Sequence, residues 1–448
     1  MNTPRSKPLA KTRTAASRMA LAVALVTGTA LGVTAFAEPA QAQRAKRDKQ
    51  KNNKASKSKY SEAFVAAYNP LDGLIKAQPV DAAAVRAAIE PAVAAAQNPD
   101  EKYAIGGMLN NAGITLDDQA LQRRGIVAML DSGLVPAENI PQYTYSAGQL
   151  AYFANDFVAA RDQFIKAAAA GYDKTDLVPI IADTYFQKED YASGLRYLKG
   201  KLNEASAAGQ KPPQDWIRRG LAASYNNDLS SEAVQFAAMY AQYYPSTENW
   251  REAINIHRNI LLLENPELLD LMRLGDMTGA LNSERDYFEY VDAADVLRLP
   301  GEVKRILDKG IASGVINSSG PRISETLRSA NSRIADDKAD LANLEGEARS
   351  AATASLARST ADAYLGYEMG DKAEALYEIA LEKGDGNASL IYTRLGIAQL
   401  MQGKVEAAKA SFAKAEGNRA AIAKLWTVFA DQQQRPALEQ AAMPTTAS

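Results

Sequence analysis

Four stretches of this 448-residue chain repeat one spacing of small and aromatic residues. A small residue is followed twelve positions later by another, then four positions on by an aromatic residue or Leu, and three further on by a fourth residue. The four sets are Gly148, Ala160, Phe164 and Ala167; Ala182, Gly194, Leu198 and Lys201; Ala361, Ala373, Tyr377 and Ala380; and Gly396, Ala408, Phe412 and Ala415. The first two sets are 34 residues apart, and a fixed period of this size indicates stacked helix pairs.

The composition agrees with helices rather than strands. Hydrophobic residues make up 47% of the chain, but aromatic residues only 7%, and much of the remainder is Ala, the best helix former. No alternating pattern of useful length interrupts the helical periodicity. We therefore predict an all-α fold in which short side chains let neighbouring helices approach closely.

Several motifs resemble a tetratricopeptide repeat: Leu395-Gly396, Gly403-Lys404-Val405, Ala407-Ala408, Phe412 and Ala415. Two predicted turns, Asn155-Asp156-Phe157 and Glu189-Asp190-Tyr191, resemble the turn between the two helices of such a repeat. The resemblance implies a right-handed α-solenoid of antiparallel helix pairs. It also implies an adaptor protein whose concave groove receives peptides or other proteins.

The first 42 residues resemble a signal peptide. Basic residues precede an uncharged stretch from Met19 to Ala37, and the first acidic residue is Glu38. Small-x-small cleavage sites end at Ala37 and Ala42. We expect export to the periplasm, or secretion, with cleavage near one of these sites; the alternative is an uncleaved signal anchor. No second apolar span follows, so no transmembrane segment is expected after cleavage.

The rest of the chain divides by composition. We predict a basic disordered linker over 43–59, a first helical array over 60–319, a connecting polar helix over 320–357, repeats with a capping helix over 358–434, and a disordered tail over 435–448. The array therefore consists of two repeat blocks joined by a longer polar helix. The linker could contact an anionic surface, or it could be a solvated spacer.

Net charge argues against nucleic acid as a partner. The whole chain carries 51 basic and 53 acidic residues, but the first 59 residues hold 13 of the basic ones and only two acidic ones, Glu38 and Asp48. The part from Tyr60 onward is therefore acidic, whereas nucleic-acid-binding domains carry basic patches.

Catalytic and metal-binding motifs are missing from the sequence. The chain has no Cys and one His, His257, which excludes disulfides, thiol catalysis and a multi-histidine metal site. Phosphate-binding, dinucleotide-binding and EF-hand motifs are absent. Adjacent carboxylates such as Asp336 and Asp337 diverge on a helix rather than converge on a substrate. We predict no enzymatic activity, no cofactor and no metal.

Residues of the first helix of each pair are the candidate binding site. The tetratricopeptide resemblance implies that they line the concave surface, and the positions are Tyr145, Gln149, Tyr152, Asp183, Phe186, Arg218 and Tyr225. Tyr and Arg combine large contact area with hydrogen bonding, as residues central to protein interfaces do. The alternative for each tyrosine is packing between repeats.

Together these features predict a non-catalytic periplasmic scaffold that mediates protein–protein interaction in the cell envelope. The alternative is a protein that binds envelope polysaccharide or peptidoglycan, with tyrosines stacked on sugar rings. A hydrolase is the third possibility, but no domain outside the repeats is available to house its chemistry.

Overall fold

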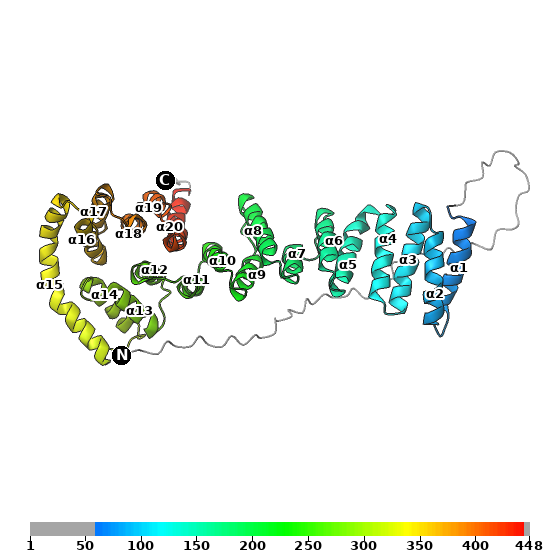
Figure 1. The fold of residues 1–448 in the computed structure, drawn as a ribbon, viewed down its shortest axis with the longest axis horizontal. Coiled ribbons are helices and arrows are strands. Elements are labelled where there is room, and N and C mark those ends of the chain that lie inside the picture. Colours follow the sequence, from blue (N-terminus) through cyan, green and yellow to red (C-terminus); the bar gives the residue numbers. More distant parts are fainter. Residues whose placement is uncertain (1–58, 443–448) are drawn as a thin grey trace, which may run out of the picture. The chain divides into compact units, whose positions relative to one another are not determined.

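The computed structural model describes residues 59–442, with side chains described for 59–434. The predicted signal peptide, residues 43–58 of the basic linker and residues 443–448 of the tail lie outside the described residues. Within them, all regular structure is helical, and twenty α-helices follow one another (Figure 1). The predicted all-α solenoid is thereby confirmed. The chain forms two compact units, which meet at residues 146 and 147 within helix α5 (Ile140–Phe153).

The first unit contains four helices, a 3₁₀ turn and the start of α5. Its helices are α1 (Glu62–Lys76), α2 (Ala82–Ala95), α3 (Pro99–Thr115) and α4 (Gln119–Asp131), and the turn covers Ala137–Asn139. Helix α1 continues through Pro70, because this proline lies on the exposed side. There its missing N–H and its ring disturb only the solvent-facing turn of the helix.

A buried carboxylate joins the starts of α1 and α3. The side chain of Glu101 accepts the backbone N–H groups of Ser61 at 2.7 Å, Gln97 at 2.8 Å and Asn98 at 3.2 Å. Burial alone would raise the pKa of Glu101, but the three donors outweigh it and lower the pKa to about 2. The residue therefore stays ionised and satisfies N–H groups that a helix start leaves without partners.

Helices α3 and α4 touch at glycines. A Cβ atom on Gly113 would lie 2.5 Å from the Gln122 nitrogen, and one on Gly125 would lie 2.4 Å from the Asn110 nitrogen. Neither position has room for a side chain, so the two backbones pack directly against each other.

The second unit begins in α5 and holds the repeats that the sequence predicts. Its helices after α5 are α6 (Phe157–Ala169), α7 (Leu177–Phe186), α8 (Tyr191–Ala207), α9 (Gln214–Asn226), α10 (Ser230–Tyr243), α11 (Thr247–Ile260), α12 (Asn265–Met277), α13 (Glu284–Ala294), α14 (Pro300–Ala312), α15 (Pro321–Ser350), α16 (Ala354–Gly366), α17 (Gly370–Glu382), α18 (Ala388–Met401), α19 (Val405–Phe412) and α20 (Asn418–Ala442).

The repeated spacing packs a ring of one helix onto a glycine of its partner. A Cβ atom on Gly148 would lie 2.8 Å from the Phe164 ring, and one on Gly396 would lie 2.4 Å from the Phe412 ring. In the pair α7 and α8 the arrangement is reversed, because the Phe186 ring of the first helix lies against Gly194 of the second. At each of these crossings, an aromatic ring of one helix occupies the space that a side chain on the glycine of the other helix would need.

The polar helix α15 joins the two repeat blocks and packs on the second one. It extends over 30 residues, and the Tyr367 hydroxyl donates to Asp337 at 2.6 Å. The Lys383 ammonium donates to the Ala348 and Arg349 carbonyls at 2.7 and 3.0 Å, near the C-terminal end of α15. A cation at a helix C-terminus is favourable because the last carbonyls lack partners within the helix.

The second block returns to the first along α20. This helix packs on α10, α12 and α18, and α18 also packs on α12 (Figure 1). At the centre of the contact is the carboxylate of Asp270, which is fully buried. One oxygen accepts from Arg273 at 3.1 Å and from Arg394 at 3.0 Å, and the other accepts from Arg419.

The buried charges balance around Asp270. Arg273 forms two hydrogen bonds with Glu302, at 2.8 and 2.7 Å, and Arg394 donates to Asp362 at 2.7 Å. Three carboxylates thus face the three guanidinium groups. Burial alone would raise the pKa of Asp270, but the charges of Arg394, Arg419 and Arg273 outweigh it and lower the pKa.

The substitution Asp270→Asn tests this network. It removes the carboxylate charge that three buried guanidinium groups share. Breaking a buried ionic network lowers the free energy of unfolding by about 3–5 kcal/mol. Chemical denaturation followed by circular dichroism would measure the loss. Asp336→Asn, at an exposed position on α15, is the control and should change stability by less than about 0.5 kcal/mol. Equal stability of the two variants would contradict this account.

The only histidine of the chain lies on the buried side of α11. His257 is 1% exposed, and its Nδ1 lies 2.8 Å from the Ala253 carbonyl oxygen. Burial lowers the pKa of His257 from 6.5 to about 4, although the bond to Ala253 acts in the opposite direction. The folded protein therefore holds this imidazole neutral, whereas the unfolded chain protonates it below pH 6.5.

Stability should accordingly fall as the pH drops from 7 to 5, by about 2 kcal/mol from this group alone. His257→Asn keeps a donor near Ala253 but cannot titrate, so its stability should stay nearly constant over the same window. Urea unfolding at several pH values compares the two slopes. Parallel slopes would show that His257 does not carry the dependence.

Candidate functional site

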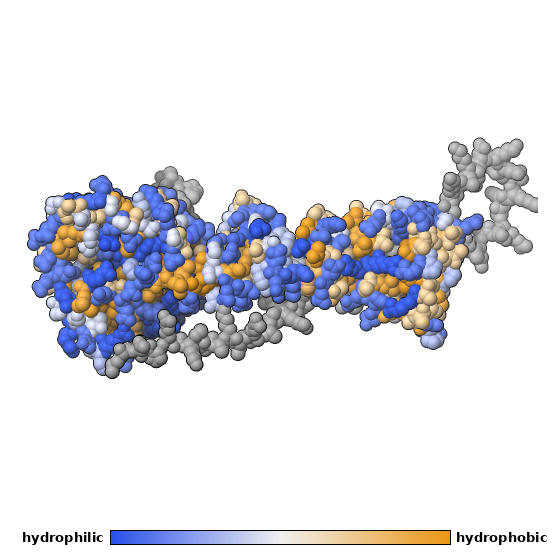
Figure 2. Space-filling model, in the orientation of Figure 1, coloured by the Kyte–Doolittle hydropathy of each residue, from blue (hydrophilic) through white to orange (hydrophobic). Residues whose placement is uncertain are grey.

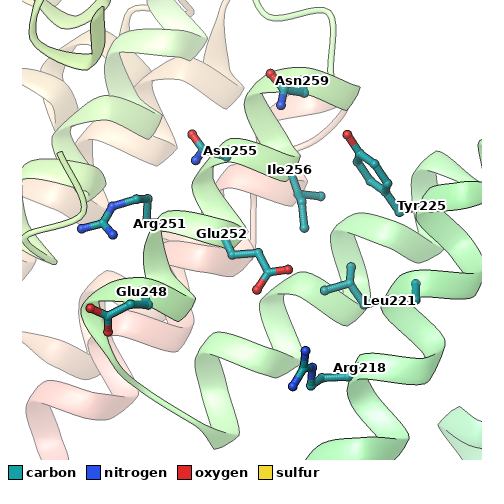
Figure 3. A pocket seen from close by; sticks show the side chains of 10 residues that line it. Arg218, Leu221, Tyr225, Glu248, Arg251, Glu252, Asn255, Ile256 and Asn259 are labelled. Carbon is teal, nitrogen blue, oxygen red and sulfur yellow. The ribbon is translucent and has the colours of Figure 1, made fainter. Parts of the chain in front are cut away.

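A cavity of about 490 Å³ opens between α9 and α11 in the second unit (Figure 3). Figure 2 shows hydrophobic side chains scattered over many helices on the face drawn, so hydropathy alone singles out no site there. The cavity does. Its lining comes from one stripe on each helix: Arg218, Leu221, Ala222 and Tyr225 on α9, and Glu248, Arg251, Glu252, Asn255, Ile256 and Asn259 on α11.

Helical periodicity explains why these residues share the cavity. On α9 they lie three to four residues apart, which is one turn, and the stripe on α11 follows the same rule. Residues of α11 outside this stripe point away from the cavity: Trp250 and Ala253 are buried. Helix α11 therefore has a polar side toward the cavity and an apolar side toward the core.

One end of the cavity is charged. Arg218 and Glu252 are exposed and point toward the space between the helices (Figure 3). The Arg251 side chain is held by a bond from its Nε to the Ala280 carbonyl at 3.1 Å. With Glu248, this end carries two positive and two negative groups, so its formal charges cancel.

The other end combines an aromatic ring with amide groups. Tyr225 is 45% exposed and lies across from Ile256 and Asn259 (Figure 3). Asn255 accepts a hydrogen bond from Arg258 at 2.6 Å, which fixes the orientation of its amide. Each Asn side chain offers both donor and acceptor groups, as a peptide bond does.

Two of the predicted site residues, Arg218 and Tyr225, line the cavity. Two others, Tyr152 and Asp183, form a separate polar contact across successive first helices, together with Arg219. The Tyr152 hydroxyl donates to the Asp183 carboxylate, which lies 3.7 Å from Arg219 Nη1. Burial, followed by the bond to Asp183, raises the pKa of Tyr152. Gln149 is partly exposed on the same helix as Tyr152.

The remaining two predicted residues are packed. Phe186 lies against Gly194 and stacks on Tyr191 at 5.9 Å between ring centres. Tyr145, in the first unit, is 6% exposed. A side chain with so little exposed surface offers a ligand almost no contact area.

The stripe on α11 is absent from the sequence-based prediction. The repeat spacing loosens after Trp250, so no repeat position points to these residues. The signal that could have identified them is simpler. Glu248, Glu252, Asn255 and Asn259 recur at helical spacing opposite the apolar residues Trp250, Ala253 and Ile254, which is the pattern of a helix with one buried side.

Within residues 59–442, no group of three or more His, Cys, Asp or Glu residues is placed to hold a metal ion. No helix in this part of the chain is long and apolar enough to span a membrane.

Comparisons with known proteins identify helical-repeat structures. No family model matches the chain, and no curated protein matches it. Among solved structures, a tetratricopeptide repeat protein from Parabacteroides merdae is 14% identical, with 73% of this chain and 98% of that chain covered and a TM-score of 0.20. Yeast Tom70 is 11% identical, with 85% of this chain and 99% of that chain covered and the same TM-score, 0.20.

Such low TM-scores carry no argument about the site, and the assignment of the fold rests on the helix pairs themselves. These pairs combine the predicted spacing, the ring-on-glycine crossings and short turns between antiparallel helices. The chain folds as a tetratricopeptide-like array of stacked helix pairs.

Proposed function

We propose that this protein is a non-catalytic scaffold that binds an extended segment of another protein in the groove between α9 and α11. The observation that carries the proposal is the lining of this groove, whose charged end, apolar middle and amide end suit a peptide. A chain segment offers backbone amides and side chains of several kinds within a short length.

The spacing of the two amides supports an extended ligand. Asn255 and Asn259 are four residues apart on α11, which places them about 6 Å apart along the helix axis. An extended chain repeats every two residues, or about 6.6 Å. Both amides can therefore pair with the backbone of one bound strand.

The apolar middle and the charged end of the groove would determine which peptide segment binds. Tyr225, Leu221 and Ile256 form an apolar surface for one ligand side chain. Beyond it, Arg218 and Arg251 favour an acidic group, and Glu248 and Glu252 favour a basic one. A segment with an apolar residue next to an ordered pair of opposite charges fits this arrangement.

The location in the cell rests on the sequence. The signal-like residues 1–42 support export to the periplasm, where the scaffold would act within the cell envelope. The basic residues of 43–59 support a contact with an anionic surface.

Photocrosslinking tests the groove. With Tyr225 replaced by p-benzoylphenylalanine, irradiation of the native cells should join the groove to one protein, whose attached peptide mass spectrometry identifies. The same replacement at Arg196, an exposed residue of α8, is the control and should not capture that protein. Equal capture at both positions would contradict the assignment of the site.

Affinity for the captured peptide should then depend on the two amides. Asn255→Ala with Asn259→Ala removes two hydrogen bonds worth about 1 kcal/mol each, so binding should weaken about 30-fold in calorimetry. Asn203→Ala, at an exposed position on α8, provides a matched control. Capture of no protein, with retention on purified peptidoglycan that is lost in Tyr225→Ala, would instead favour the polysaccharide-binding alternative.

Export makes a separate prediction. The mature protein isolated from its native cells should begin at Glu38 or Gln43, directly after the two cleavage sites. N-terminal sequencing of the purified protein reads this directly. A chain that retains Met19 to Ala37 would support the signal-anchor alternative.

A further inference from the structure

The helix that forms one wall of the groove contacts the C-terminal helix on its other side. Trp250 of α11 is 4% exposed, and its Nε1 donates to the Gln432 side chain of α20 at 3.3 Å. The same Gln432 donates to the Ala241 carbonyl of α10 at 2.9 Å. A single amide thus connects α20 to both α10 and α11.

Aromatic rings extend this contact into the second repeat block. The Trp250 ring lies 6.2 Å from that of Phe429, which lies 6.1 Å from that of Trp426. Trp426 donates through Nε1 to the backbone oxygen of Asp270 at 3.0 Å. The rear of α11 is therefore connected, ring by ring, to the buried charges around Asp270.

The two walls of the groove share one neighbour, α10, and differ in the others. Helix α9 packs on α7, α8 and α10, all in the first repeat block. Helix α11 packs on α10 and α12, and its Trp250 also contacts α20. Trp250 lies between Glu248 and Arg251 in sequence, so the turn of α11 that carries the charged end of the groove is the turn that contacts α20.

We propose that α20 positions the groove from behind, with Trp250 and Gln432 as positioning residues that fix α11 relative to α9. This inference rests on the proposed function only in treating the groove as the binding site. The C-terminal block then has a role beyond stability, because it sets the separation of two helices that bind the partner.

The cysteine-free chain allows a direct test without a partner. Asp215→Cys on α9 and Asn259→Cys on α11 place two exposed thiols for spin labels across the groove. Pulsed electron paramagnetic resonance then gives the distribution of distances between the labels. A second pair, Asp162→Cys on α6 and Arg196→Cys on α8, reports on helices away from the groove.

In the full chain we expect one narrow distribution for each pair. Phe429→Ala should broaden the α9–α11 distribution and leave the α6–α8 pair unchanged, and Gln432→Ala should produce a smaller change in the same direction. Lys424→Ala, at an exposed position on α20, should change neither. Gln432→Ala removes only polar contacts, so it keeps the test valid if Phe429→Ala fails to fold.

An α9–α11 distribution that remains narrow in both variants would overturn the proposal. Broadening of both label pairs would overturn it as well, because α20 would then act only on general stability. The outcome does not depend on partner capture at Tyr225, so the positioning role and the proposed function can fail separately.

Discussion

A buried carboxylate with three guanidinium partners determines how this chain closes on itself. Asp270 of α12 is paired with Arg273 of its own helix, Arg394 of α18 and Arg419 of α20. An isolated charge in the interior is very unfavourable, so each of these groups requires the others in place. Helices α12, α18 and α20 therefore have to assemble together, and the second repeat block cannot detach without leaving charges unpaired in its interior.

This closure changes the character of the array. Helix pairs in a solenoid depend mainly on their neighbours, so damage and fluctuation remain local. Here Arg394 and Arg419 contact Asp270 across 124 and 149 residues of sequence. Such long-range contacts make the part from α10 to α20 one interdependent structure, whereas the helices from α5 to α9 retain the neighbour-to-neighbour organisation of a repeat protein.

The features that could be predicted from the sequence are those repeated in it. The crossing of Gly148 with Phe164 and that of Gly396 with Phe412 are visible because the same spacing recurs. The network around Asp270 has no such signal. Its charged residues belong to helices far apart in the sequence, and a charged residue on an amphipathic helix is ordinarily exposed. Arg394, which is 1% exposed, is the only charged residue of α18, and the apolar residues on all sides of this helix indicate burial but not the partner of the guanidinium group.

The candidate site was predictable only in part, for a related reason. Arg218 and Tyr225 belong to a regular repeat, and the resemblance to a known architecture indicates which side of the helix they occupy. Helix α11 lies where the repeat gives way to the closed part of the structure: it packs on α10 and α12, and its Trp250 also contacts α20. Its polar stripe is readable by periodicity alone, but periodicity does not say which polar stripe faces solvent and which faces a groove.

Under the proposed function, the charges of the groove imply a particular kind of recognition. The chain from Tyr60 onward is acidic, so its field attracts basic partners from a distance. The groove itself carries two arginines and two glutamates, whose formal charges cancel. If the groove binds a partner as proposed, overall attraction and local fit are therefore separate: the field of the whole body would influence which molecules approach, and the order of charges along the groove would decide which of them match. A partner selected in this way would be distinguished by its pattern of charges rather than by its net charge.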